Sequence, residues 1–355
     1  MVETKAVNVA LLGYGYAGKT FHAPLISSVS GMTLAKVVSS SSEKVLADYP
    51  NSSVTASHDE VFADDSIDLV VIATPNDTHF DLAKRALNAA KHVVVDKPFT
   101  TTVDEAKELI KLAEKQNRIL SVFHNRRWDA DFLTIKKLLE SNVLGEVMHF
   151  ESHFDRYRPQ VRDRWREQAG AGTGIWFDLG SHLLDQVLQL FGKPDSIFAD
   201  LELQRDNAAA IDYFHAILSY GKRRVILHGS ALVAADNARF TVHGKLGSFV
   251  KFGLDTQEDS LKDGEKVNVG NWGLDTRDGS LTTYNGDKPQ NSFLTTERGD
   301  YVAFYEQVRS AITQGSPNPV TANDALMVME LLELGITSSN TRKAMSYTEE
   351  LHRKV

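Results

Sequence analysis

The sequence predicts a two-domain protein: an α/β domain with a doubly wound parallel sheet, then an α+β domain built on a mostly antiparallel sheet. The chain has 355 residues, which is more than a single hydrophobic core usually organises. Short apolar runs alternate with helical patterns in the first third of the chain, and strands with a period of two replace them afterwards. We therefore expect one domain over residues 1–124 and a second over residues 125–355.

The first domain is expected to contain a parallel sheet, because its strands are near-continuous apolar runs of the kind that is covered on both faces. Helices are predicted between the strands, and the last of them opens with a capping box in which Thr102 and Glu105 satisfy free backbone donors. This succession predicts right-handed crossovers. The expected strands are Val7–Leu12, Leu34–Ser39, Leu69–Ala73, His92–Asp96 and Ile119–Phe123, and the expected helices are Phe21–Val29, Thr78–Ala90 and Val103–Gln116.

The second domain is expected to combine antiparallel strands with a few helices. Along residues 147–158 apolar and polar side chains alternate, which predicts one face on a core and one face toward water. The segment Asp255–Arg298 is rich in Gly, Asp, Asn and Thr and predicts a long loop. Hairpins are expected at 211–220 with 223–233 and at 240–243 with 248–252, and helices at 131–140, 175–191, 301–313 and 323–339.

Composition narrows the class of protein. The net charge of -8 and the absence of a basic stripe argue against nucleic acid as a partner. The chain has no cysteine, which excludes disulfides and thiolate chemistry and fits a cytoplasmic location. No signal-peptide layout is visible, and no apolar run reaches the length of a membrane span, so no membrane partner is expected.

A glycine-rich loop follows the first predicted strand and opens a helix. Its residues are Gly13, Tyr14, Gly15, Tyr16, Ala17 and Gly18, which match the GxGxxG pattern. The three glycines allow a tight turn, a close approach of the backbone to a pyrophosphate, and close packing of helix on strand. The loop therefore predicts a Rossmann-type domain that binds a dinucleotide, whereas the same glycines outside this context would form an ordinary surface turn.

The end of the second predicted strand bears on which dinucleotide binds. NAD sites usually place an acidic residue there, on the ribose 2′-hydroxyl. Here Ser39, Ser40 and Ser41 occupy the strand end, and Lys44 follows nearby, which favours the 2′-phosphate of NADP. NAD is the alternative, because Glu43 would meet the ribose if the strand end lay a little further along the chain than assumed.

Candidate catalytic residues come from two segments. Asp96, Lys97 and Pro98 follow the fifth strand, where a doubly wound sheet binds its ligands, and Pro98 keeps Lys97 out of helical conformation. Asp178 and His182 are four residues apart on a predicted helix, so they share one face and suit a carboxylate–imidazole acid–base pair. The alternatives are that Lys97 is an ordinary surface lysine and that Asp178 and His182 are an ordinary pair on a polar helix face.

Two further segments are expected near the cofactor. Thr74, Pro75, Asn76 and His79 follow the fourth strand, and Asn125 marks the exit from the first domain. Each of these segments could equally serve only to form a turn. No metal is predicted, because none of the histidine-rich segments has a convincing spacing of ligands.

In this order, the segments GYGYAG, ATPNDTH, DKP, HNRRW and GTGIWFDLGSHLLDQ resemble the glucose–fructose oxidoreductase/inositol dehydrogenase family over essentially the whole chain. The family's Glu-Lys-Pro is Asp-Lys-Pro here. The resemblance is strongest to the NADP-dependent scyllo-inositol dehydrogenase branch. It implies hydride transfer with His182 as acid–base, Lys97 on the reacting oxygen, Asp178 orienting the imidazole and Asn125 near the nicotinamide. Candidate substrate contacts are Lys97, Asp155, Tyr157, Arg158, Arg164, Trp165, Asp178 and His182.

Other readings stay open. A dehydrogenase for another sugar, aldose or diol, a biliverdin-type reductase, and a dinucleotide-sensing regulator without turnover share this scaffold. Both Lys97 and His182 are present, which disfavours the regulator. The open face of the antiparallel sheet is expected to be apolar and to pair with another copy, as in relatives, which predicts a homodimer or homotetramer.

Overall fold

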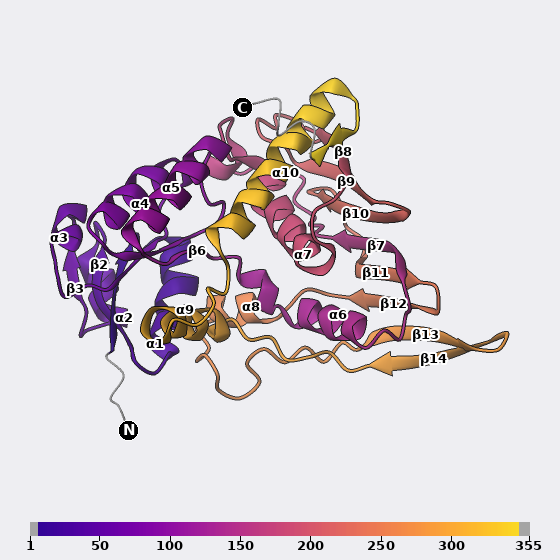
Figure 1. The fold of residues 1–355 in the computed structure, drawn as a ribbon, viewed down its shortest axis with the longest axis horizontal. Helices are drawn as coiled ribbons and strands as arrows, with labels where there is room; N and C mark the ends of the chain where they lie inside the picture. The colour runs from indigo at the N-terminus through magenta and orange to yellow at the C-terminus, as the bar shows by residue number, and fades with distance from the viewer. Residues whose placement is uncertain (1–5, 348–355) are drawn as a thin grey trace. The chain divides into compact units, whose positions relative to one another are not determined.

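The computed structural model describes residues 6–347, which form two compact units (Figure 1). The first unit holds residues up to 128 together with 257–272 and 300–326, and the second unit holds the rest. The sequence-based division at residue 124 assigns both returning segments to the second domain. Contacts within the first unit explain their place there: Ser121 Oγ donates to the carbonyl of Val320 over 2.8 Å, and Arg126 pairs with Glu258 at 2.6 Å.

The first unit is built on a six-stranded parallel sheet with the order β3-β2-β1-β4-β5-β6. This is the doubly wound order of dinucleotide-binding domains, in which the chain reverses direction across the sheet between β1 and β4. The predicted strands are confirmed, and a short strand, β3, joins them at one edge. The bounds are β1 Val7–Leu12, β2 Met32–Val38, β3 Ser53–Thr55, β4 Leu69–Ile72, β5 His92–Val95 and β6 Leu120–Val122.

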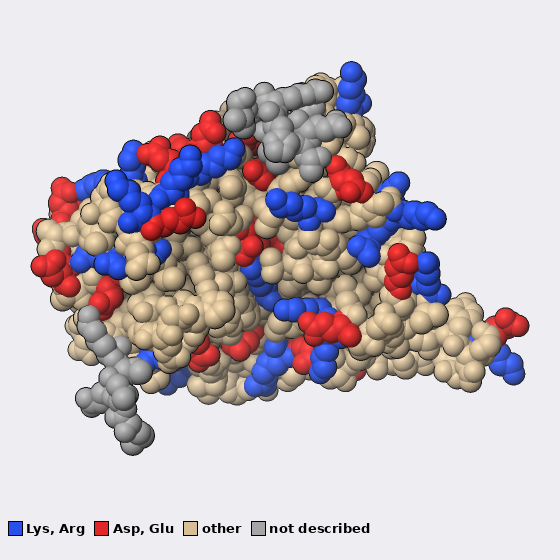
Figure 2. All heavy atoms as spheres, in the orientation of Figure 1, with Lys and Arg blue, Asp and Glu red and all other residues tan. Residues whose placement is uncertain are grey.

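Helices flank this sheet, and the capping box of α5 is present as predicted. Thr102 Oγ1 accepts from the Glu105 amide over 3.3 Å, and a Glu105 carboxylate oxygen accepts from the Thr102 amide over 3.2 Å. Over α4 and α5, Lys and Arg mix with Asp and Glu (Figure 2), as in the 2.7 Å pair of Lys84 with Glu108. The bounds are α1 Ala23–Ser28, α2 Ser42–Asp48, α3 His58–Phe62, α4 His79–Asn88, α5 Val103–Gln116, α8 Gln257–Lys262 and α9 Val302–Gln314, with short turns η1 Gly18–His22, η2 Asn76–Thr78 and η3 Asn125–Trp128.

The second unit is built on a nine-stranded sheet with the order β14-β13-β12-β11-β7-β10-β9-β8-β15. All its pairings are antiparallel except that of β7 with β10, which is parallel. The structure therefore confirms a mostly antiparallel sheet. The bounds are β7 Val147–His153, β8 Ser196–Glu202, β9 Tyr213–Tyr220, β10 Arg223–Ser230, β11 Ala238–Gly244, β12 Gly247–Phe252, β13 Gly279–Asn285, β14 Lys288–Leu294 and β15 Met345–Ser346.

One face of this sheet is covered by helices. Trp176 is fully buried and donates from its indole nitrogen to the carbonyl of Leu332 over 3.0 Å, while the amide of Ala199 in β8 donates to Ser338 Oγ over 3.0 Å. The first contact connects two helical segments of the layer, and the second connects the layer to the sheet. The elements are α6 Ala130–Glu140, α7 Ser181–Phe191 and α10 Ala322–Thr341, with short turns η4 Trp165–Glu167 and η5 Trp176–Gly180.

The prediction of a long loop over Asp255–Arg298 is wrong. This segment contains helix α8 and the β13–β14 hairpin, which pairs from Gly279 with Leu294 to Asn285 with Lys288 (Figure 1). Most side chains of β14 are exposed, so the hairpin has little of the apolar alternation that marks a strand in a sequence.

The face of the sheet opposite the helices is mixed in character, whereas the sequence predicts an apolar surface. Along β7 and the residue after it, Phe150, Ser152 and Phe154 are buried, whereas His149, Glu151 and His153 stay partly exposed. His215 in β9 and His228 in β10 are partly exposed as well. The central strands therefore present histidines and carboxylates on this face. Separately, among residues 6–347 no helix is long and apolar enough to span a membrane.

His92 at the start of β5 predicts a measurable loss of stability in acid. Burial first, and then the cation of Arg118, lowers the pKa of His92 to about 4, and its Nδ1 accepts from the amide of Ile119 over 3.0 Å. An unfolded histidine has a pKa of about 6.5, so the unfolded chain takes up the proton first as the pH falls. We expect this residue to remove roughly 1–3 kcal/mol of unfolding free energy between about pH 6.5 and pH 4.

Urea unfolding at several pH values, compared with His92→Asn, checks this expectation. The asparagine oxygen can accept from the same amide but does not titrate, so the variant should show a shallower decline below pH 6.5. The other histidines contribute equally to both proteins. Equal slopes for the two proteins would contradict the assignment.

Candidate functional site

The carboxyl ends of the parallel strands collect most of the predicted cofactor residues. The glycine loop follows β1, the serines follow β2, Thr74 follows β4, Lys97 follows β5 and Asn125 follows β6. Doubly wound sheets bind their ligands at this edge, where the strand order reverses. The first unit alone therefore assembles this set.

The three glycine positions of the loop differ in what a side chain would meet there. Gly13 has φ +95°, and a Cβ there would lie 2.7 Å from the carbonyl oxygen of Ala73. A Cβ at Gly18 would collide with the carbonyl of Gly13. Gly15 is exposed, and a Cβ there would meet nothing within 4 Å. The fold thus requires Gly13 and Gly18, whereas the space beside Gly15 fits the close approach of a pyrophosphate.

The turn after β2 carries hydroxyl groups at the position of the usual ribose carboxylate. Ser39 Oγ accepts from the amide of Ser41 over 3.1 Å, which forms a tight turn before α2. Ser40 is exposed, and so are Glu43 and Lys44 in the first turn of α2. The strand end therefore offers small hydroxyl groups, with one acidic and one basic side chain beyond them.

A hydrogen-bonded cluster ties the glycine loop to α2. Tyr14 Oη donates to Asp48 over 2.7 Å, and Lys19 Nζ lies 2.7 Å from the same carboxylate. The bonds to Lys19 and Tyr14 lower the pKa of Asp48. Tyr16 is half exposed, and Ala17 precedes the turn η1, in which Gly18 is buried.

His79 joins the loops that follow β4 and β5. Its Nδ1 lies 2.9 Å from the carbonyl oxygen of Pro98, and its Nε2 lies 3.0 Å from that of Thr74. Both ring nitrogens therefore contact backbone carbonyls, and burial lowers the pKa of this histidine. In this structure His79 holds the two loops together. Pro75 in the first loop is exposed and Asn76 is buried.

Asp96 supports the backbone at Lys97. Its Oδ1 accepts from the Lys97 amide over 2.8 Å and lies 3.9 Å from Nε2 of the buried His22, whose Nδ1 is 2.5 Å from Tyr305 Oη. Burial raises the pKa of Asp96, but His22 and Lys97 outweigh it and the pKa is lowered. Lys97 itself is partly exposed, and it precedes Pro98 through a cis peptide bond. The ionised Asp96 therefore holds the peptide that carries Lys97.

The second unit holds the predicted acid–base pair. Asp178 lies in η5, a π-helical turn, and His182 lies in the first turn of α7 and is 6% exposed. The spacing in the sequence assumes a regular α-helix between Asp178 and His182, but the structure has a π-helical turn there. Two arginines approach the Asp178 carboxylate: Arg156 at 4.0 Å and Arg166 at 3.9 Å.

Arg156 and Arg166 are the residues that sequence reasoning missed. The neighbouring Arg158 and Arg164 were singled out instead, because the strand beyond residue 153 loses its alternation in sequence. Arg164 pairs with Glu167 at 3.1 Å, and Arg158 donates its amide to the carbonyl of Ala231 over 2.7 Å. Two consecutive contacts, Arg156 with Ser230 and Arg158 with Ala231, show that the chain still follows β10 here.

The remaining substrate candidates have the following surroundings. Asp155 accepts from the amide of Ser230 over 3.1 Å and from Asn237 over 3.1 Å, and it faces the histidines of the sheet. Tyr157 is 61% exposed and Trp165 is 39% exposed. In the first unit, Asn125 is buried in η3 directly after β6.

A six-stranded parallel sheet of this order, with a GxGxxG turn after its first strand, defines a dinucleotide-binding protein. The chain belongs to the glucose–fructose oxidoreductase/inositol dehydrogenase family. Residues 7–124 match "Oxidoreductase family, NAD-binding Rossmann fold" and residues 136–347 match "Oxidoreductase family, C-terminal alpha/beta domain". It is therefore an NAD(P)-binding oxidoreductase.

Individual relatives cover nearly the whole chain. The uncharacterised oxidoreductase YdgJ of Escherichia coli is 57% identical over 96% of this chain and 98% of its own length. The scyllo-inositol 2-dehydrogenase (NADP(+)) IolW of Bacillus subtilis is 39% identical over 97% of this chain and 96% of its own. Among solved structures, the YPO2259 protein of Yersinia pestis superposes with a TM-score of 0.94 at 54% identity, over 96% of this chain and 97% of that one.

Proposed function

We propose that this protein is an NADP-dependent dehydrogenase that interconverts scyllo-inositol, or a closely related polyol, and the corresponding ketone. The observation that carries the proposal is the local setting of Lys97 and His182. The first follows β5 at the ligand-binding edge of its sheet, and the second is buried at the start of α7, four residues after Asp178. The similarity to IolW supports the substrate class.

The proposed chemistry assigns one task to each residue. When bound, the nicotinamide supplies or accepts the hydride. His182 takes the hydroxyl proton during oxidation and returns it during reduction. The Lys97 ammonium donates a hydrogen bond to the reacting oxygen and stabilises negative charge that develops there. Asp178 orients the imidazole and is itself held between the guanidinium groups of Arg156 and Arg166.

The remaining cofactor contacts follow from the strand ends. We propose that the amides of the glycine loop hold the pyrophosphate, and that Ser39, Ser40, Ser41 and Lys44 bind the 2′-phosphate. Thr74, Pro75, Asn76 and Asn125 line the path toward the nicotinamide, and His79 and Asp96 hold the loops that carry this path. Tyr157, Arg158, Arg164 and Trp165 remain proposed substrate contacts, whereas Asp155, the other candidate from the sequence, pairs with His153 and His228.

Ser39→Asp tests the preference for NADP. The new carboxylate can still accept from the Ser41 amide, so the turn should persist, but it would repel a 2′-phosphate and could accept from a 2′-hydroxyl. We expect NADP⁺ affinity to fall at least about tenfold while NAD⁺ affinity holds or improves, since a like-charge contact costs on the order of 1–2 kcal/mol. Lys44→Ala should weaken NADP⁺ alone. Unchanged discrimination in both variants would overturn the 2′-phosphate assignment.

A substrate panel tests the reaction itself. Absorbance of the reduced nicotinamide would be followed with NADP⁺ and with NAD⁺ on scyllo-inositol, myo-inositol, glucose and xylose. Turnover of scyllo-inositol with NADP⁺ is the expected result. Turnover of a different polyol would keep the reaction class and replace the substrate. Tight cofactor binding without any turnover on the panel would contradict the proposed activity.

We also propose that the chain forms a homodimer or homotetramer. Apolar side chains on the uncovered face of the nine-stranded sheet, among them Phe198 and Ile217, stay partly exposed. Light scattering coupled to gel filtration would give the mass, and a monomer at micromolar concentration would contradict the proposal.

A further inference from the structure

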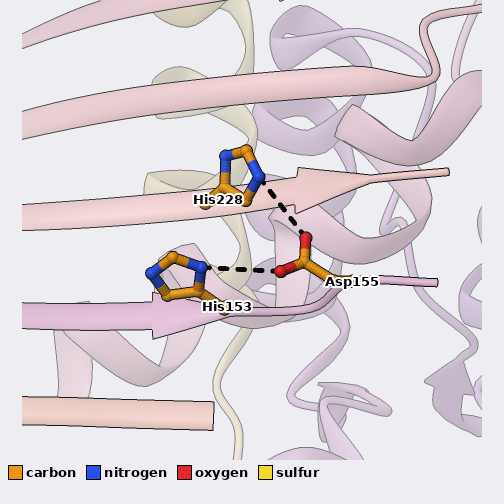
Figure 3. Close-up of side chains that lie close together, drawn as sticks. All are labelled: His153, Asp155 and His228. Carbon is orange, nitrogen blue, oxygen red and sulfur yellow. Dashed lines mark ion pairs between the residues drawn. The ribbon is translucent and has the colours of Figure 1, made fainter. Parts of the chain in front are cut away.

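Three side chains from two neighbouring strands of the second unit point toward one another: His153, Asp155 and His228 (Figure 3). Strands β7 and β10 are parallel, and their register places His153 directly opposite His228. Asp155 is two residues beyond His153, and the backbone continues the ladder there, so the carboxylate emerges on the same face. The fold itself therefore brings together these two imidazoles and one carboxylate.

The spacing of the three groups matches that of metal ligands. Asp155 Oδ2 lies 3.6 Å from His153 Nδ1, and Asp155 Oδ1 lies 3.4 Å from His228 Nε2. One ligand atom from each residue lies within 4.8 Å of the other two. In a tetrahedral zinc site with bonds of about 2.0–2.1 Å, neighbouring ligand atoms are about 3.4 Å apart. A single ion could thus contact all three residues after small adjustments of their side chains.

The cluster also leaves a buried polar atom without a close hydrogen bond. His153 Nδ1 is buried, and its partner in the cluster is the Asp155 carboxylate, with which it forms an ion pair at 3.6 Å. Its nearest acidic oxygen, at 3.6 Å, is too far for a good hydrogen bond. Buried polar atoms nearly always have a partner, and an ion is one of the groups that can supply it.

Outer contacts hold both imidazoles as a metal site requires. His153 Nε2 contacts a Glu151 carboxylate oxygen at 3.1 Å, and His228 Nδ1 faces His215 Nδ1 at 3.4 Å. In each histidine the nitrogen directed away from the cluster therefore has a partner. A carboxylate behind a ligating histidine fixes its tautomer and orientation in many metal proteins.

We propose that His153, Asp155 and His228 bind one divalent transition-metal ion of the Zn²⁺ class, with water completing the coordination, although the spacing of the histidines along the sequence predicts no metal. Two imidazoles and one carboxylate suit such ions, whereas Mg²⁺ and Ca²⁺ prefer sites built from oxygen atoms. The side chains of the three residues are 21%, 9% and 15% exposed in the single chain, in chain order, and they lie on the sheet face through which copies of the chain are proposed to pair. The ion would link β7 to β10, and the proposal does not depend on the dehydrogenase activity.

Titration of the full-length protein with metal tests the site directly. Protein stripped with EDTA is titrated with Zn²⁺ against a chromogenic chelator, and Mg²⁺ is titrated in parallel. We expect one Zn²⁺ per chain, a higher melting temperature with Zn²⁺, and no competition from Mg²⁺. Co²⁺ in place of Zn²⁺ should give the visible absorption of a four-coordinate site.

Variants assign the ligands. His153→Gln/His228→Gln should lose about 100-fold or more in Zn²⁺ affinity, and Glu151→Gln about tenfold, since loss of an outer partner weakens metal sites by about 10–100-fold. His243→Gln is the matched control, because His243 lies on the neighbouring strand β11 and bonds to Ser248 instead. It should bind like the unmodified chain.

Several outcomes would overturn the site. The proposal fails if the unmodified chain shows no one-to-one binding, or if the double variant binds Zn²⁺ as tightly as the unmodified chain. It also fails if His243→Gln loses as much affinity as the double variant. Circular dichroism verifies folding, and if the double variant does not fold, His228→Gln alone must weaken binding at least about tenfold.

Discussion

Replacing His182 with Asn should lower kcat about 10²–10⁴-fold, because the reaction then lacks the group that accepts and returns the hydroxyl proton. Lys97→Met should lower kcat about 10²–10³-fold, because the charge that develops on the reacting oxygen loses its cation. Steady-state kinetics with NADP⁺ and scyllo-inositol would measure both. The proposed contact of His182 is with the substrate hydroxyl, so cofactor affinity should be unchanged in His182→Asn.

The double variant adds a sharper test of the proposed pair. Groups that act together on one reacting atom are strongly non-additive, so Lys97→Met/His182→Asn should be little slower than the slower single variant. Losses that multiply would show that the two residues act independently. Lys84→Met and His243→Asn are matched controls: Lys84 pairs with Glu108 on the surface and His243 with Ser248. Both should turn over normally.

The second large effect is expected from the glycine loop. Gly18→Ala should destabilise the protein by about 1–3 kcal/mol, because its Cβ would collide with the carbonyl of Gly13 and the backbone would have to move. Gly15→Ala should change stability by less than about 0.5 kcal/mol, because its Cβ would enter open space. The same methyl group should raise the dissociation constant of the dinucleotide at least about tenfold by blocking its close approach.

Two measurements separate these effects. Urea unfolding without cofactor gives the stability, and quenching of protein fluorescence by NADPH gives the affinity. If Gly15→Ala bound NADPH as tightly as the unmodified chain, the pyrophosphate would not lie on this loop as proposed. Equal destabilisation by the two variants would show that Gly15 is a structural requirement.

Much of the first unit could be predicted from the sequence because its signals are local. Each buried parallel strand is a continuous apolar run, and the capping box of α5 and the glycine turn after β1 involve residues only a few positions apart. The expected helix at 21–29 appears as a π-helical turn followed by α1, a detail of hydrogen bonding that periodicity does not reveal. The short elements β3, α2 and α3 carry too few residues to show a period.

The candidate site was predictable to the extent that it follows from strand ends. A residue after a parallel strand lies at the ligand-binding edge whatever the details of packing, which is why Lys97 and Asn125 could be placed there. The two arginines at Asp178 could not be chosen from the sequence, because five arginines lie between residues 156 and 166 and only the folded path of this segment distinguishes them.

The sequence by itself determined the class of fold, the dinucleotide loop and the family, since these depend on short-range patterns along the chain. The tertiary structure alone decided the contacts between distant segments. It returned residues 257–272 and 300–326 to the first unit, and it paired the backbones of β13 and β14 although most side chains of β14 are exposed. It also brought His228 opposite His153, because the parallel register of β7 and β10 is set by the packing of the whole sheet.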